Sequence, residues 1–186
     1  MTPTEAQGRT LLGVAREAIR HGLEHGAPPI VDAGAFEAPL SEPGSSFVTL
    51  HLGGALRGCI GSLQAHQPLV CDVAQHAYGA AFGDRRFQPL GSAELAAVHL
   101  HLSILSPLEP VIYASEHALL SMLSPGIHGL LIELDGARAT FLPTVWRSIP
   151  QGPAFLEQLK RKAGLEPHAN GYRAWRYTTV EFSEES

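Results

Sequence analysis

The stretch FVTLHL-GG-ALRGCIG, residues 47–61, decides the first part of the fold. Apolar and polar residues alternate on both sides of the Gly53-Gly54 pair, and two glycines suit the two-residue turn of a β-hairpin. The alternation places Arg57 and Cys59 on one face of the second strand. Leu56 and Ile60 then lie on the opposite face, so this strand is predicted to have a polar side and an apolar side.

The rest of the chain mixes helices and hairpins without regular β-α-β alternation. Helical spacing, capping residues and breakers predict helices at 4–25, 68–82, 115–123 and 153–163. Alternating patterns predict further strands at 97–107, 128–134, 137–142 and 172–182, with Asp135-Gly136 as a type I′ turn. We therefore expect an α+β fold, with a mainly antiparallel sheet and flanking helices.

Composition and charge narrow the range of functions. The chain has 186 residues, 45% hydrophobic and 17% charged, which suits one domain or two small lobes that share a core. No apolar run approaches the roughly 18 residues of a membrane span, and no signal-peptide pattern is visible, so a soluble, cytoplasmic protein is expected. The net charge of −5 speaks against nucleic-acid binding. Two cysteines outside any CxxC spacing predict neither a disulfide framework nor a metal or cluster site.

Cys59 is the first candidate for chemistry, and two interpretations of it stay open. Free cysteines are most often small apolar residues buried in a core. Alternatively, Arg57 on the same face would lower the pKa of the thiol, and Gly58 and Gly61 would leave room for a ligand. A nucleophilic cysteine usually also needs a base nearby.

Three histidines could serve as that base: His51 on the first strand of the hairpin, His101 and His128. His99 and His101 are two residues apart on a strand, so their imidazoles share one face. Solvation explains that pair more simply than a metal site does, and no metal is predicted. Glycines on either side of His128 suggest a turn that displays its imidazole, either to solvent or to a ligand.

The segment GDRRF, residues 83–87, places an acid, two arginines and an aromatic ring directly after a helix. Asp84 could simply pair with Arg86 and hold the loop. Alternatively, the Arg86 guanidinium could face an anionic ligand, for which its planar shape is suited. We therefore treat Asp84, Arg86 and Phe87 as candidate binding residues.

Several segments, taken in order, together carry a resemblance to one family: GALRGCIGSL, DVAQHAYGAAFGDRRFQPL, ELAAVHLHLSILSPLEPV, HGLLIELDGARATFLPTVW and FLEQLKRKAGL. From about Phe47 to Phe182 the chain resembles the AMMECR-type domain, which in prokaryotes is protein A of the AmmeMemoRadiSam system. The resemblance implies a single domain over residues 1–186, made of two closely packed, unequal α+β lobes that share a cleft lined by the LRGCIG strand. It also implies that seven residues match family motifs: Arg57, Gly58, Cys59, Gly61, Asp84, Arg86 and Phe87.

The chain departs from the family pattern at two positions. Relatives usually carry proline where this chain has Arg85, and a glutamate where it has His101. The second change replaces an anion by a titratable imidazole on the face that bears Ser103. If that glutamate is an obligatory acid or base in the family, its role here is either filled by His101 or abandoned.

The resemblance further implies partners, a Memo-like protein and a radical-SAM protein. We therefore expect a cleft protein that uses Cys59 and Arg57 to bind or act on a small or peptidyl substrate, as a component of a modification system with those partners. Whether it is an enzyme stays open, and no cofactor is expected. One alternative is a non-catalytic adaptor that docks the same partners, and a weaker one is a nucleic-acid-associated regulator.

Overall fold

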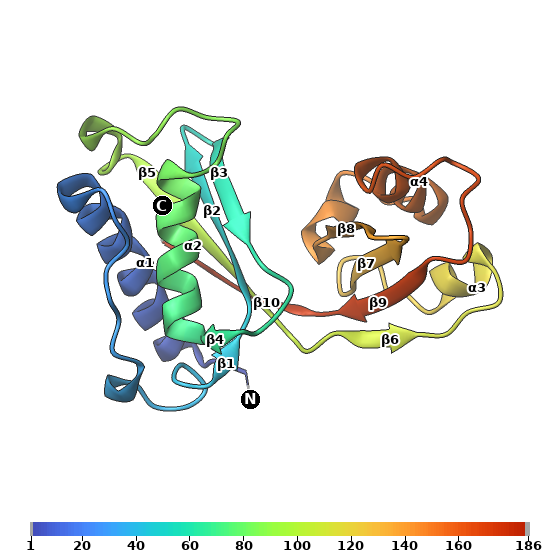
Figure 1. Ribbon diagram of the computed structural model, residues 1–186, viewed down its shortest axis with the longest axis horizontal. Coiled ribbons are helices and arrows are strands. Elements are labelled where there is room, and N and C mark those ends of the chain that lie inside the picture. Colours follow the sequence, from blue (N-terminus) through green and yellow to red (C-terminus); the bar gives the residue numbers. More distant parts are fainter. Residues whose placement is uncertain (1, 185–186) are drawn as a thin grey trace. The chain divides into compact units, whose positions relative to one another are not determined.

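A computed structural model describes residues 2–184, in which the chain divides into two compact units. Unit 1 comprises the residues up to Leu105 together with those from Val180 onward, and unit 2 comprises Ser106–Thr179. The chain therefore enters unit 2 after one strand of unit 1 and returns for the last strand (Figure 1). Where unit 2 begins and ends, the Ser106 N–H donates to the Thr178 carbonyl, and the Thr178 N–H donates to the Ser106 hydroxyl, each at 2.9 Å.

Unit 1 combines two long helices with a four-stranded sheet. Its elements are α1 (Glu5–His25), η1 (Ala33–Ala35), β1 (Pro43–Gly44), β2 (Ser46–Leu52), β3 (Ala55–Gly61), β4 (Gln67–Pro68), α2 (Leu69–Phe82), η2 (Ser92–Glu94), β5 (Val98–Leu105) and β10 (Thr179–Ser183). The strand order is β10-β5-β2-β3, so β3 is an edge strand, and β2 pairs antiparallel with both β3 and β5. Helices α1 and α2 lie side by side and cover one face of this sheet (Figure 1).

The core of unit 1 lies between that face and the two helices. Val48 and Leu50 on β2 and Leu102 on β5 are fully buried there. Helix α2 offers a face of small residues, and Ala77 and Ala80 let it approach the strands closely. The period-two pattern of the strands thus explains the apolar face, and their alternate residues form a polar face on the opposite side.

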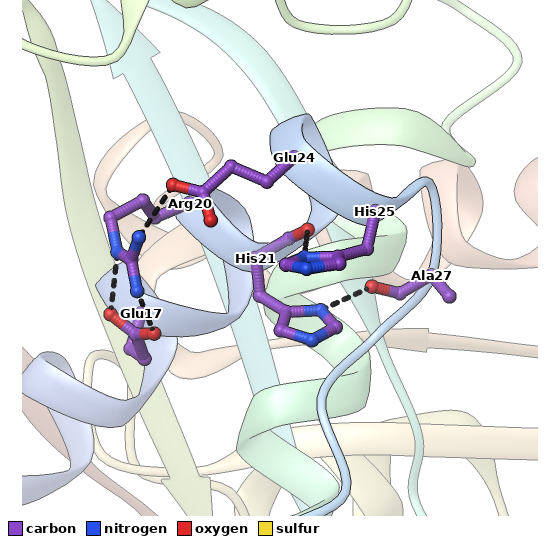
Figure 2. Close-up of polar contacts among 6 residues, drawn as sticks. All are labelled: Glu17, Arg20, His21, Glu24, His25 and Ala27. Carbon is purple, nitrogen blue, oxygen red and sulfur yellow. Dashed lines mark hydrogen bonds and ion pairs between the residues drawn. The ribbon is translucent and has the colours of Figure 1, made fainter.

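Helix α1 begins and ends where its sequence predicts. Thr4 and Gln7 form a capping box at its start, and Gly26 ends it with a left-handed backbone at φ 68°. In the last turns the rings of His21 and His25 stack with centroids 4.1 Å apart, and their Nδ1 atoms contact backbone carbonyls (Figure 2). These contacts tie the last turns of α1 to the backbone that follows the helix at Ala27.

Unit 2 has its own sheet and its own core. Its elements are β6 (Glu109–Val111), α3 (Glu116–Ser121), β7 (Gly129–Leu134), β8 (Ala137–Phe141), η3 (Pro143–Arg147), α4 (Gly152–Lys162) and β9 (Arg173–Tyr177). The sheet is antiparallel with the order β6-β9-β7-β8. Phe155, Leu156 and Leu159 of α4 pack with Leu130 and Ile132 of β7. The turn between β7 and β8 has positive φ at Asp135 and Gly136, as a type I′ turn requires.

The fold confirms the α+β class and corrects the strand predicted at 172–182. That segment forms two strands: β9 belongs to the sheet of unit 2 and β10 to the sheet of unit 1. Its alternating pattern continues across Thr178, and periodicity alone does not show that a strand changes sheets. The three-residue strand β6 was not expected, because Pro110 at its centre argues against a strand. None of the helices within residues 2–184 is long and apolar enough to cross a membrane.

Candidate functional site

Cys59 lies on the edge strand β3, and the loop after α2 covers that edge. The Cys59 N–H donates to the Asp84 carboxylate at 2.9 Å, where a further strand would otherwise pair. Asp84 is itself buried, with 8% of its surface exposed. The GDRRF segment therefore provides a hydrogen-bond partner for a backbone N–H of β3 that would be unpaired at an uncovered sheet edge.

Asp84 and Arg86 form the ion pair that the sequence allowed. The Arg86 guanidinium donates from Nε at 3.0 Å and from Nη2 at 2.6 Å, and the Arg86 N–H donates to the same carboxylate at 3.1 Å. The hydrogen bond from Arg86, with those from the Cys59 and Arg86 backbones, holds the pKa of the Asp84 carboxyl well below its usual range. The guanidinium carbon lies 5.5 Å from the centroid of the Phe87 ring. Asp84 thus fixes the conformation of the loop, and the guanidinium of Arg86 is the exposed positive charge of the loop.

Arg57 is also paired, with a residue that the sequence did not single out. Its Nε and Nη2 atoms donate to the two oxygens of Glu94 at 2.7 and 3.0 Å. This hydrogen bond, with a second from the Gly91 N–H, lowers the pKa of Glu94 to about 2. Among the residues that the structure describes, the buried Nη1 atom of Arg57 has no partner. The charge of Arg57 is therefore balanced by Glu94, while one donor of its guanidinium is unused.

The Cys59 thiol belongs to a line of polar side chains that crosses the sheet. Thr49 on β2 is the cross-strand neighbour of Cys59 on one side and of His101 on the other. The Thr49 hydroxyl donates to the Cys59 sulfur at 3.3 Å, and His101 Nε2 lies 2.8 Å from the Glu181 carboxylate on β10. Thiol, hydroxyl, imidazole and carboxylate thus come from four adjacent strands. We call Cys59, Thr49, His101 and Glu181 the polar row.

Glu181 supplies a carboxylate beside His101. Its Oε2 atom also accepts a hydrogen bond from the Ser103 hydroxyl at 2.6 Å, while its buried Oε1 atom has no partner among the described residues. His101 on β5 therefore has a carboxylate partner on the neighbouring strand. A glutamate near the C-terminus, far from His101 in sequence, gives no signal of this pairing before the sheet order is known.

A bulge in β3 changes which residues share the face of Cys59. The register shifts between Leu50 and His51, so His51 pairs with Leu56 and Arg57 is the extra residue. Leu56 is 42% exposed. The prediction that Leu56 shares a face with Ile60, opposite Cys59, is therefore wrong, because the bulge interrupts the alternation on which it rested.

Gly58 and Gly61, near Cys59 on β3, lack room for a side chain for different reasons. A Cβ atom on Gly58 would lie 2.1 Å from the Ala80 carbonyl oxygen, so Gly58 permits the close approach of α2. A Cβ atom on Gly61 would lie 2.3 Å from the Phe47 ring and 2.5 Å from the Ser46 carbonyl oxygen. The open space that we expected beside Gly61 is absent, since the Phe47 ring fills it.

Of the three candidate bases, only His51 and His101 belong to the same unit as Cys59. His51 lies two residues from Thr49 on β2 and faces His99 across the strands. His128 belongs to unit 2, where its Nδ1 atom accepts the Ser124 N–H at 2.9 Å. Burial lowers the pKa of His128, and its hydrogen bond closes the turn before β7. His128 therefore acts in the structure of that turn.

A second polar cluster in unit 1 contains a serine, an aspartate and a histidine, the residue types of a catalytic triad, but a substrate cannot reach it. The Ser46 hydroxyl donates to Asp72 at 2.7 Å, and His76 Nδ1 lies 3.1 Å from the same carboxylate oxygen. Ser46 is fully buried, so its hydroxyl cannot meet a substrate. These three residues join α2 to β2. In residues 2–184, no group of three or more His, Cys, Asp or Glu side chains could hold a metal ion.

Comparison with known proteins points to one family. The sequence model of AMMECR1 matches residues 12–182. A protein of Methanothermobacter thermautotrophicus is 34% identical over 87% of this chain and 84% of its own length, and one of Aeropyrum pernix is 37% identical over 76% of this chain. The chain spans 61% of the length of the Aeropyrum protein. The crystal structure of an uncharacterized protein from Pyrococcus horikoshii superposes with a TM-score of 0.88 at 29% identity, covering 96% of this chain and 91% of that one.

Proposed function

Because the chain belongs to the AMMECR1 family, we propose that it binds and acts on a small or peptidyl substrate at the polar row, with Cys59 as the reacting group. In this proposal it works in a modification system together with a Memo-like protein and a radical-SAM protein, the partners that the family resemblance implies. The observation that carries the proposal is the position of Cys59 and the His101–Glu181 pair on either side of Thr49.

The spacing of the row indicates where a substrate would lie. Strands in a sheet are about 4.8 Å apart, so Cys59 and His101, two strands apart, are separated by roughly 10 Å at the backbone. That separation leaves no direct contact between sulfur and imidazole, but it suits a group seated over Thr49 that meets both. Glu181 would orient the imidazole, as a carboxylate does for a histidine that transfers protons.

Substitution of Cys59 in the chromosomal gene distinguishes this proposal from its alternatives. Cells that carry Cys59→Ser should show the same altered peptide and small-molecule masses as cells without the gene, because the reacting sulfur is lost. Cells with the matched control Cys71→Ser should resemble the wild type. If Cys59→Ser cells also resemble the wild type while the deletion differs, Cys59 does not react and the proposal fails.

One observation favours the non-catalytic adaptor as a second candidate. Arg57 and Arg86 are both neutralised by carboxylates, and Leu56 is an exposed apolar side chain on the same strand as Cys59. An exposed apolar residue with paired charges around it suits a docking surface. The adaptor predicts that Leu56→Ser weakens binding to the Memo-like protein in calorimetry, whereas Cys59→Ser leaves that binding unchanged.

A further inference from the structure

Unit 2 contains a pocket that is separate in sequence from the polar row. It has a volume of about 760 Å³, which lies within the range of small-molecule sites. Its walls come from the chain that runs from β6 into α3, from Lys160 on α4, and from the segment that leads into and along β9. All of the lining residues belong to unit 2, so the pocket can be described within that unit alone.

A network of hydrogen bonds fixes one wall of this pocket. Lys160 is buried, with 4% of its surface exposed, and its Nζ atom donates to Glu116 at 2.7 Å and to the Pro167 carbonyl. The Tyr172 hydroxyl donates to the same Glu116 oxygen at 2.9 Å, and the Tyr113 hydroxyl donates to the Tyr172 carbonyl. A buried ammonium group is costly unless it is paired, and here the pairing also joins α3, α4 and the segment before β9. The wall is therefore preorganised.

Other polar groups of the lining are left for a ligand. Among the described residues, the side chains of His168 and Asn170 and the second oxygen of Glu116 make no hydrogen bond. Arg173 donates only from Nη2, to Glu133, so its Nε and Nη1 donors are unused. Its guanidinium carbon lies 5.4 Å from the centroid of the Trp175 ring.

The charged residues that line the pocket are two cations and one anion, and Glu133, which pairs with Arg173, lies outside the lining. Lys160 and Arg173 are cationic and Glu116 is anionic, whereas the whole chain has a net charge of −5. A guanidinium that is held against an aromatic ring is well suited to a planar or tetrahedral oxyanion. Pro110, Ile112 and Trp175 line the pocket with apolar surface that is at least partly exposed.

We propose that this pocket binds a small organic anion, a carboxylate or phosphate group carried on a flat apolar body. The free donors of Arg173, together with His168, which also lines the pocket, bind the anionic group, and the apolar walls bind the body. The unused oxygen of Glu116 accepts a hydrogen bond from a hydroxyl group of the same ligand. This site does not depend on the chemistry proposed for Cys59.

Nuclear magnetic resonance with four matched probes tests the assignment. The ¹⁵N-labelled full chain is titrated with benzoate, phenyl phosphate, neutral benzamide and cationic benzylamine, all of which carry one benzene ring. We expect benzoate or phenyl phosphate to shift the backbone amide signals of residues 112–116 and 168–175 saturably, with an affinity at least fivefold higher than for the other two. The stronger of the two anions then tells whether carboxylate or phosphate is preferred.

Two variants connect the binding to Arg173. Arg173→Gln should weaken binding of the preferred anion roughly threefold to tenfold, because it removes a charged donor. Glu133→Gln breaks the same ion pair but keeps the guanidinium, so it should bind the anion as well as the wild type or better. Tighter binding of benzylamine, equal binding of all four probes, absence of saturable shifts at these residues, or equal weakening by both variants would each overturn the proposal.

Discussion

The backbone N–H of Cys59 donates to a side-chain oxygen of Asp84 at 2.9 Å, so the loop after α2 takes the place of a neighbouring strand at the edge of the sheet. This one hydrogen bond connects the LRGCIG strand with the GDRRF loop, across 25 residues of the chain. It also explains why an acid follows the helix at this point. The carboxylate is held by Arg86 on one side and offers its oxygen to β3 on the other.

Replacement of Asp84 should therefore cost more than the loss of a surface ion pair. We expect Asp84→Asn to lower the free energy of unfolding by about 1–3 kcal/mol, because the buried carboxylate accepts charge-assisted hydrogen bonds from Arg86. Urea denaturation of both proteins at pH 7 measures the difference. Arg85→Gln is the matched control: Arg85 is exposed, makes no hydrogen bond or ion pair with the described residues, and should change stability by less than about 0.5 kcal/mol. A loss as small for Asp84→Asn as for the control would contradict the role of Asp84 at the edge.

The Arg57–Glu94 pair should make stability depend on pH in the acid range. The pKa of Glu94 falls from 4.5 to about 2 in the folded chain, so the stabilisation is complete above about pH 4.5 and disappears as the pH falls toward 2. We expect wild type to exceed Glu94→Gln by roughly 1–2 kcal/mol at pH 6, a value reduced for partial solvent exposure, and by nearly nothing at pH 2. Unfolding free energies of both proteins across this range give the difference directly.

Glu157→Gln provides the control for that measurement. Glu157 contacts Arg161 at 3.3 Å with both side chains largely exposed, so its removal should give a small difference at every pH. A difference between wild type and Glu94→Gln that does not change between pH 6 and pH 2 would show that Glu94 contributes through packing and not through its charge.

The sequence predicts most of the local structure, because period-two and helical patterns are local. The hairpin at 47–61, the capping box at Thr4 and the turn at Asp135 follow from residues that lie close together in the chain. The partners of the candidate site do not follow in this way. Glu94 is 37 residues from Arg57, and Glu181 is 80 residues from His101, so only the sheet order and the loop path bring them together.

The bulge at Arg57 shows a different limit of sequence reasoning. One extra residue exchanges the faces of every residue before it in the strand, and Leu56 moves from the predicted apolar face to the face of Cys59. The space that we expected Gly58 to leave for a ligand is filled by the Ala80 carbonyl oxygen of α2. The sequence alone does not show that Gly58 faces the backbone of a helix, whereas Gly61 faces the side chain of Phe47 on the adjacent strand.

The two cysteines should differ in their rates of alkylation. Burial raises the pKa of the Cys71 thiol, which also donates to the Val31 carbonyl at 3.6 Å, so little of it is thiolate at pH 7. We expect iodoacetamide to modify Cys59 faster than Cys71, as measured by peptide mass spectrometry over time. Thr49→Val, which removes the donor to the Cys59 sulfur, should slow that site by roughly twofold to tenfold and leave Cys71 unchanged. Faster labelling of Cys71 would remove the argument that Cys59 reacts.

Alanine at the two strand glycines should destabilise the chain, but only one of the two should be rescued. The atoms that crowd Gly58 belong to the Ala80 main chain of α2, which cannot move without shifting the helix. Gly58→Ala should therefore cost roughly 2–4 kcal/mol in unfolding free energy. The Phe47 ring supplies the nearest atoms at Gly61, so Gly61→Ala should regain part of its loss when Phe47→Ala is added, whereas Gly58→Ala should not.

Gly13→Ala is the control: a Cβ there meets nothing within 4 Å, and in the middle of α1 it should stabilise by about 0.5–1 kcal/mol. Thermal and urea melts of the single and double variants measure these effects. If Gly61→Ala alone is as stable as the wild type, the Phe47 ring does not occupy the face beside Cys59, and that space is open to a ligand.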